Sequence, residues 1–90
     1  MKIKQIGSNM TVLTLNDGTE ILFSYATPVA GYLSMEALET RPFPKEVGNG
    51  VLFFRTAKKW SSTTTRHINK YLEGCTAAVV PQDQIESLVG

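Results

Sequence analysis

The chain has 90 residues, of which 42% are apolar and 19% are charged, and its formal net charge is +1. This length predicts a single domain over residues 1–90 with a thin core. The composition excludes general disorder, and no run of about 18 apolar residues is present to cross a membrane. Cys75 is the only cysteine, so the chain cannot form an internal disulfide, which favours a reducing, intracellular setting.

The first third of the chain has the pattern of β-structure. Residues 2–6 are a strand candidate, and residues 11–15 and 19–25 alternate apolar and polar side chains. Asn16-Asp17-Gly18 between them predicts a tight hairpin, because glycine takes a positive φ at little steric cost. Pro28 cannot donate a ladder hydrogen bond, so we expect a bend, a bulge or a strand end over residues 26–30, with residues 29–33 as a possible further strand.

The middle of the chain loses this pattern. Residues 35–39 could form one helical turn, and the two prolines of Arg41-Pro42-Phe43-Pro44 then exclude regular structure. Residues 34–50 therefore read as a long connection for so small a domain. Long loops of this kind are often functional or mobile.

The second half predicts two more strands and two helices. Residues 51–56 and 77–80 are strand candidates, and the hydroxyl run 61–65 offers N-caps for a helix over about 64–73 that ends before Gly74. Pro81 suits the first position of a short helix over residues 82–89. The expected fold is α+β, with a small antiparallel β-sheet of about four to five strands, one main helix packed on it and a short C-terminal helix.

Positive charge is concentrated in one block. No acidic residue occurs from 47 to 72, whereas five cations do. On the proposed helix the side chains of Arg66, Asn69 and Lys70 face outward, so the residues expected to contact a partner or nucleic acid are Lys58, Lys59, Arg66, Asn69 and Lys70. Cations can contact phosphates, and asparagine can read an adenine edge.

Other readings of this block remain open. The hydroxyl run 61–65 at the helix start could hold a small anion or a nucleotide. Against a nucleic-acid role, the pI of about 7.9 is below the value above 9 that is typical of dedicated nucleic-acid domains. Trp60 is more typical of a core or rim anchor than of a base-stacking platform. Surface helices also carry Lys and Arg without any partner.

Enzyme chemistry has no support in the sequence. It contains no glycine-rich phosphate loop, no nucleophile elbow and no carboxylate pair at a recognisable spacing. One His and one Cys are too few for a zinc site. We therefore expect a protein without catalytic residues, metal or cofactor.

The segment Trp60-Ser61-Ser62-Thr63-Thr64-Thr65-Arg66-His67-Ile68-Asn69 resembles a widespread family of short uncharacterised bacteriophage proteins with a W-[RS]-x-x-T-T-x-R-x-x-N signature. The hairpin around Asn16-Asp17-Gly18-Thr19 is similar to members of the same group. The resemblance covers the hairpin and residues 53–72. It implies a phage origin and the host cytoplasm, and it assigns no activity and no functional residue.

Three functions follow as expectations. The first is a small non-enzymatic bacteriophage accessory protein that binds a host or phage protein. The alternatives are nucleic-acid binding through the basic helix 64–73 and small-anion or nucleotide binding at 61–65. No membrane association is expected, and both a monomer and a homodimer remain open, because the edge strands of a small sheet can pair across a two-fold axis.

Overall fold

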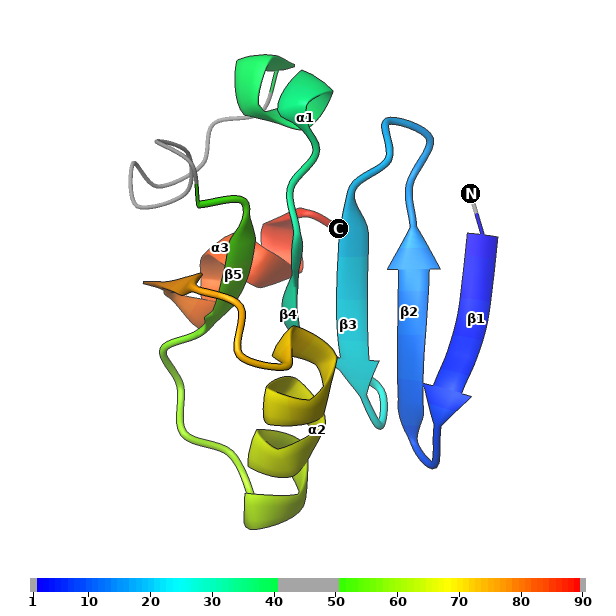
Figure 1. Ribbon diagram of the computed structural model, residues 1–90, viewed down its shortest axis with the longest axis vertical. Helices are drawn as coiled ribbons and strands as arrows, with labels where there is room; N and C mark the ends of the chain where they lie inside the picture. The colour runs from blue at the N-terminus through cyan, green and yellow to red at the C-terminus, as the bar shows by residue number, and fades with distance from the viewer. Residues whose placement is uncertain (1, 41–50, 90) are drawn as a thin grey trace.

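The computed structural model describes residues 2–40 and 51–89, and within them six strands and three helices (Figure 1). The strands are β1 (Lys2–Gly7), β2 (Met10–Thr14), β3 (Glu20–Ser24), β4 (Thr27–Tyr32), β5 (Phe53–Thr56) and β6 (Ala77–Val80). The helices are α1 (Met35–Thr40), α2 (Ser62–Leu72) and α3 (Gln82–Ser87). The α+β class is therefore confirmed.

The strands form one sheet in the order β1-β2-β3-β4-β5-β6. Neighbours from β1 to β5 are antiparallel, but β5 and β6 are parallel. The expected count of about four to five strands was thus too low, and the expected antiparallel sheet is mixed. The physical reason is the connection after β5. Parallel strands need a crossover of about a dozen residues or more, and α2 supplies it.

The hairpin predicted at Asn16-Asp17-Gly18 is confirmed by its local geometry. Gly18 has φ 90°, and the backbone N–H of Thr19 donates to Oδ1 of Asp17 over 2.9 Å. The register between β3 and β4 shifts between the pairs of Ala30 and Pro28, so of the bend, bulge or strand end expected at 26–30 the structure has a bulge. The strand candidate at 29–33 instead occupies residues 27–32, because the bulge lets Pro28 sit inside β4.

The helix α2 begins within the hydroxyl run 61–65, as predicted. Its first residue is Ser62, two residues before the expected start at about Thr64. Ser61 is the N-cap, and its Oγ accepts a hydrogen bond from the N–H of Thr64. The buried stripe is Thr64, Ile68 and Leu72. The helix ends at Leu72, because Glu73 takes a left-handed conformation and Gly74 follows with φ 84°.

The two shorter helices also differ from the sequence prediction. The C-terminal helix α3 is shorter than the expected range 82–89, with Pro81 at its N-cap rather than its first turn. The turn expected at 35–39 is α1. Residues 41–50, with the Arg-Pro-Phe-Pro segment, lie outside the described residues.

Helices cover both faces of the sheet, with α2 in front and α3 behind in Figure 1. Consecutive residues of β5 show the alternation, because Phe53 packs toward the α2 side and Phe54 toward the α3 side. The α2 side of the core is Met10, Val12, Leu22, Val29, Ala30, Ile68 and Leu72. The α3 side is Ile21, Leu33, Ala37, Phe54, Ala78, Val80, Ile85 and Leu88.

Candidate functional site

A groove of about 400 Å³ lies where β5, the segment after it, α2 and β6 meet. We call it the basic groove. Three of its lining side chains are cationic, and none of the lining residues within 2–40 and 51–89 carries a carboxylate. The lining residues are Arg55, Thr56, Ala57, Lys58, Lys59, Trp60, Thr65, Ile68 and Val79. The groove therefore combines positive charge with an apolar wall.

The fold explains how these residues come together. Arg55 on β5 is paired with Val79 on the parallel strand β6, so both lie on the α2 side of the sheet. Ala57 then bonds back to the end of β6, its N–H donating to the carbonyl of Val80 over 2.7 Å. The N–H of Lys58 donates to Oγ1 of Thr56 over 3.0 Å. These bonds fix the segment that carries the two lysines.

Trp60 is part of the groove wall and of the core. Its ring packs against the α2 side of the core, and Nζ of Lys58 lies 4.3 Å from the ring centroid. This is the geometry of a cation–π contact. The indole Nε1 is buried and has no hydrogen-bond partner within residues 2–40 and 51–89. The ring is therefore not an open platform for a stacked base.

The structure separates the five residues predicted as the site. Lys58 and Lys59 line the groove, whereas Arg66, Asn69 and Lys70 are exposed on α2 and are not part of its lining. Thr65 and Ile68 are the α2 residues that line the groove. With 100° of rotation about the helix axis per residue, Arg66 and Lys70 point about 130° and 170° away from the mean direction of these two. The predicted basic set is thus two separate surfaces.

The hydroxyl run 61–65 is used by the protein itself. The Oγ of Ser61 accepts from the N–H of Thr64, and Oγ1 of Thr65 donates to the carbonyl of Ser61 over 3.2 Å. Oγ1 of Thr64 is buried against Oγ of Ser24 at 3.0 Å. Three of these groups therefore act as helix cap and helix-to-sheet contact, which weakens the case for an anion site there.

His67 is half-buried and tied to the sheet. Oγ of Ser24 lies 2.7 Å from its Nδ1, and the ring centroids of His67 and Tyr25 are 5.9 Å apart. A serine and a histidine at this distance are also typical of a nucleophile with its base. Here Ser24 is only 2% exposed and already contacts Thr64, so it cannot reach a substrate. The cluster fastens α2 to the end of β3.

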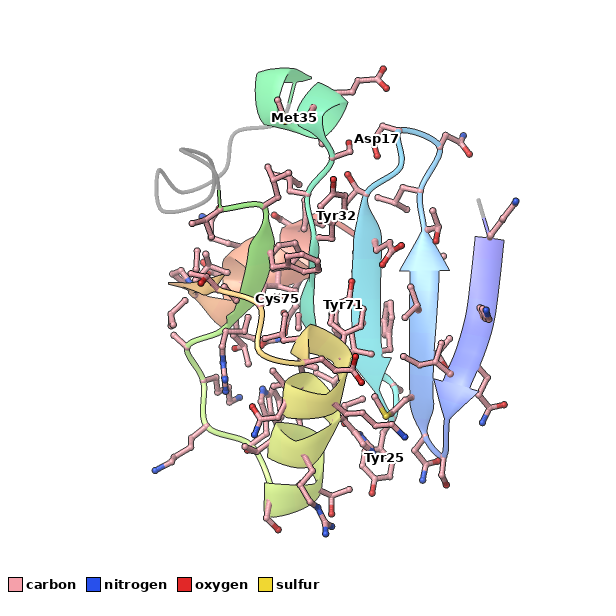
Figure 2. The ribbon with its side chains drawn as sticks, in the orientation of Figure 1. Asp17, Tyr25, Tyr32, Met35, Tyr71 and Cys75 are labelled. Carbon is pink, nitrogen blue, oxygen red and sulfur yellow. The ribbon has the colours of Figure 1, made fainter. Side chains whose placement is uncertain are left out.

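A second polar contact fastens the other end of α2. The hydroxyl of Tyr71 donates to Oε1 of Glu20 over 2.9 Å (Figure 2 labels Tyr71). Burial, followed by the hydrogen bond and the negative charge of Glu20, raises the pKa of Tyr71 far above its ordinary value of 10. The ring lies 6.3 Å from that of Phe53. Tyr71 is therefore a structural residue whose hydroxyl stays protonated at neutral pH.

Within residues 2–40 and 51–89, no group of three or more His, Cys, Asp or Glu side chains is placed to hold a metal ion. None of the helices in that part of the chain is long and apolar enough to span a membrane.

A protein-family model, described as a family of unknown function (DUF8033), matches residues 1–87. The chain belongs to this family. No curated protein and no solved structure matches it. Within this DUF8033 chain, Arg66 and Asn69 follow Trp60 by six and nine residues, one fewer than in the signature of the phage proteins that the segment resembles. The family match assigns no activity, so the function must be argued from the geometry.

Sequence reasoning missed part of the groove. The sequence places Arg55 among the cations of the basic block and Val79 in a strand candidate, but it predicts neither as a site residue. Alternation along β5 places Arg55 two residues after Phe53 and so on the α2 side, a signal that was available. The parallel pairing that brings Val79 beside it had no local signal, since it depends on the crossover through α2.

Proposed function

We propose that this DUF8033 protein is a non-enzymatic bacteriophage accessory protein that acts in the host cytoplasm. Its basic groove binds an acidic segment of a host or phage protein. The observation that carries the proposal is the convergence of Arg55, Lys58 and Lys59 on one groove, among whose lining residues in the described part of the chain there is no carboxylate. The resemblance at 60–69 supports the phage origin.

The walls of the groove favour a polypeptide over a simple anion. Ile68, Val79 and the edge of Trp60 give it an apolar side, and Val79 is 58% exposed. A volume of about 400 Å³ is in the range of sites that take a few side chains. An acidic residue next to an aliphatic one would pair with the cations and cover Val79 together. Arg55 adds a planar fork that suits carboxylate.

Nucleic acid is the weaker candidate for this groove. Stacked bases need open aromatic faces, and Lys58 lies over the ring of Trp60. A phosphate backbone also needs a continuous track of cations. Arg66 and Lys70 point away from the groove, so the two groups of cations do not form one track. These two features support a protein partner.

The fluorescence of Trp60 gives a direct assay of binding. Trp60 lines the groove, and it is the only tryptophan of the chain. The probes are a 12-residue peptide that alternates glutamate and leucine, and a single-stranded DNA of equal charge. We expect the peptide to bind and to change the Trp60 emission. Lys58→Glu with Lys59→Glu should weaken peptide binding by about tenfold or more.

The matched control is Arg66→Glu with Lys70→Glu, which changes the net charge equally on the other side of α2. Its peptide affinity should stay within about threefold of the wild type, which corresponds to the small effect of exposed charges. Equal losses in both double variants would show general electrostatic attraction and contradict the proposal. Tighter binding of the DNA than of the peptide, with a steep salt dependence, would establish the nucleic-acid alternative instead.

A further inference from the structure

The opposite edge of the sheet, at β1, is the second unusual surface. All residues of β1 from Lys2 to Ile6 are exposed, and Ile3 is 73% exposed. β1 pairs with β2 on one side, and no described strand pairs with its other side. Such an edge presents backbone N–H and C=O groups that another strand can bond. This edge lies at the far end of the sheet from the basic groove (Figure 1).

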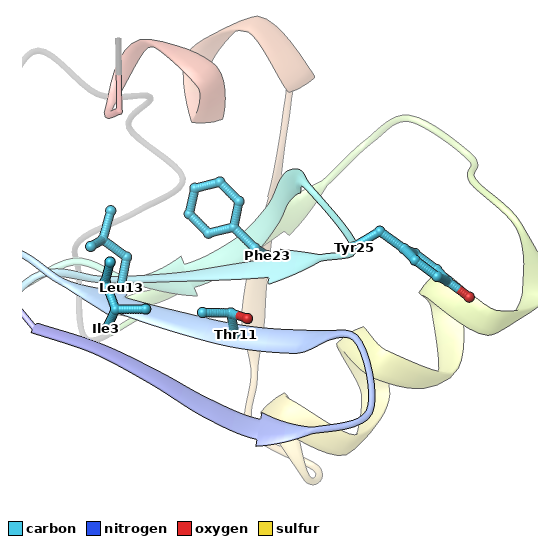
Figure 3. A pocket seen from close by; sticks show the side chains of 5 residues that line it. All are labelled: Ile3, Thr11, Leu13, Phe23 and Tyr25. Atoms are coloured by element: carbon cyan, nitrogen blue, oxygen red, sulfur yellow. The ribbon is translucent and has the colours of Figure 1, made fainter.

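Beside this edge the α3 side of the sheet is bare and apolar. A shallow pocket of about 250 Å³ is lined by Ile3, Thr11, Leu13, Phe23 and Tyr25. In Figure 3, Ile3 lies on β1, Thr11 and Leu13 on β2, Phe23 on β3, and Tyr25 just after the end of β3. The helix α3 packs against β4 and leaves this end of the face open. Ile3 stands opposite Leu13 in the register, so the apolar surface reaches the edge itself.

The other side of the edge is basic. Alternation along β1 places Lys2 and Lys4 on the face opposite to Ile3. Both lysines are exposed, and the first acidic residue of the chain is Asp17. An added strand would therefore meet cations on one face and an apolar surface on the other.

A second copy of this chain fits the edge poorly. Antiparallel pairing of β1 with itself about a two-fold axis centred on Lys4 places that lysine opposite its own copy. An axis centred on Ile3 places Lys2 opposite Lys4 twice, and like charges in directly opposed positions are destabilising. An axis centred on Gln5 avoids both clashes but falls on the irregularity between Gln5 and Gly7. The lysines thus oppose self-association while leaving the edge able to accept an acidic strand.

Tyr25 lies beside the pocket at the end of β3, with its ring turned toward α2, where its centroid is 5.9 Å from that of His67 (Figure 3). Its φ is 58°, because Tyr25 and Ala26 form the tight turn between the paired residues Ser24 and Thr27. The N–H of Tyr25 donates to the carbonyl of Asn9 over 2.8 Å, and the side chain is nevertheless 54% exposed.

We infer that β1 is the docking edge for an extended segment of another protein in which acidic and apolar residues alternate. The segment adds a seventh strand to the sheet. Its apolar side chains extend the contact of Ile3 over the pocket, and its carboxylates face Lys2 and Lys4. Backbone hydrogen bonds give the affinity of such strand addition, and the alternate side chains give its specificity. This surface is independent of the basic groove.

The test is amide NMR of the full chain titrated with an end-capped peptide of four Val-Glu repeats. The largest shifts and the strongest slowing of amide exchange should occur in residues 2–7. Lys2→Glu with Lys4→Glu should lower the affinity by about tenfold or more. A peptide of four Val-Lys repeats should bind that variant better than the wild type, which shows that the variant edge is still folded. Ile3→Ser should weaken both peptides.

The matched control is Arg66→Glu with Lys70→Glu, the same charge change at exposed positions of α2 that line neither surface, which should leave the shifts of residues 2–7 with the Val-Glu peptide unchanged. Shifts concentrated at residues 55–60 would overturn the inference in favour of the groove. The inference would also be overturned if the Lys2→Glu with Lys4→Glu variant bound the Val-Glu peptide as tightly as the wild type does. Sedimentation showing a wild-type dimer that Ile3→Ser dissociates would assign the edge to a second copy instead.

Discussion

The two ends of the sheet are built differently. At the β4–β6 end, helices lie on both faces, and Leu33, Phe54 and Val80 are completely buried. At the β1 end, one face is bare and every residue from Lys2 to Ile6 is exposed. A chain of this size has too little apolar surface to cover both ends. The core therefore lies at one end, and the other end is left as surface.

This difference separates two kinds of candidate interaction surface. The basic groove lies where three elements of the covered end meet, so its cations are held on a fixed frame. The β1 edge depends on one hairpin and offers backbone groups and a shallow apolar face. Substitutions of tightly packed residues should therefore cost more stability at the covered end than at the open end.

Glycine-to-alanine changes give the largest contrast. At Gly31 in β4, an added Cβ would meet the carbonyl of Glu20 and the ring of Phe54, closer than real Cβ atoms approach. We expect Gly31→Ala to lower the free energy of unfolding by about 3 kcal/mol. At Gly7 in β1 the nearest atom is Sδ of Met10 at 3.2 Å, at the end of a flexible side chain. Gly7→Ala should cost less than about 1 kcal/mol.

Urea unfolding measures both changes. Gly7→Ala is the control for the Gly31 variant, because the chemical change is the same. Comparable losses in the free energy of unfolding at the two sites would show that the β1 end is packed as tightly as the β4 end.

Ser24 tests the contact between the end of β3 and the helix α2. Ser24→Ala removes the partner of Thr64 and of Nδ1 of His67, and should lower the free energy of unfolding by about 1–3 kcal/mol. Ser8→Ala, at an exposed turn position, should change it by less than about 0.5 kcal/mol. Urea unfolding again provides the measurement. A neutral Ser24→Ala would mean that the hydrogen bonds of Ser24 do not help to hold α2 on the sheet.

Of these variants of buried side chains, Tyr71→Phe should have the smallest effect on the free energy of unfolding at neutral pH. It should also change how that free energy falls at alkaline pH. The pKa of Tyr71 is raised in the folded state, so the folded chain keeps the proton that the unfolded chain loses above about pH 10. Stability from this group is complete below that pH and declines as the pH rises further. Tyr71→Phe should cost about 1 kcal/mol at pH 7 and remove part of the alkaline decline.

The measurement for Tyr71 is urea unfolding at pH 7 and from pH 10 upward. Tyr25→Phe is the control, because Tyr25 is 54% exposed and its hydroxyl, unlike that of Tyr71, bonds no carboxylate within residues 2–40 and 51–89. An alkaline decline of unchanged steepness in Tyr71→Phe would show that other groups cause it.

Local chemistry determined much of the fold. Four features each depend on a few neighbouring residues: the Asn16-Asp17-Gly18 turn, an irregularity around Pro28, a hydroxyl cap within 61–65, and the inward positions Ile68 and Leu72 of the helix. Their side chains and φ preferences act over one turn or one strand pair, so the sequence predicts them. For the same reason the predicted helix was misplaced by only two residues at its start.

The candidate surfaces were predictable only in part. The sequence located the positive charge and pointed to Lys58 and Lys59. It did not separate them from Arg66 and Lys70, because that separation depends on how α2 is rotated against the sheet. Arg55 and Val79 meet only through the parallel pairing of β5 and β6, whose residues are 24 positions apart in the register.

By itself, then, the sequence determined the α+β class, the turns, the caps and the concentration of charge, because these follow from short-range chemistry and composition. Only the tertiary structure decided that the sheet has a sixth strand in parallel, that helices cover both faces of one end, and that the β1 edge stays open. Those features depend on which distant strands bury their apolar faces together. No local pattern specifies that choice.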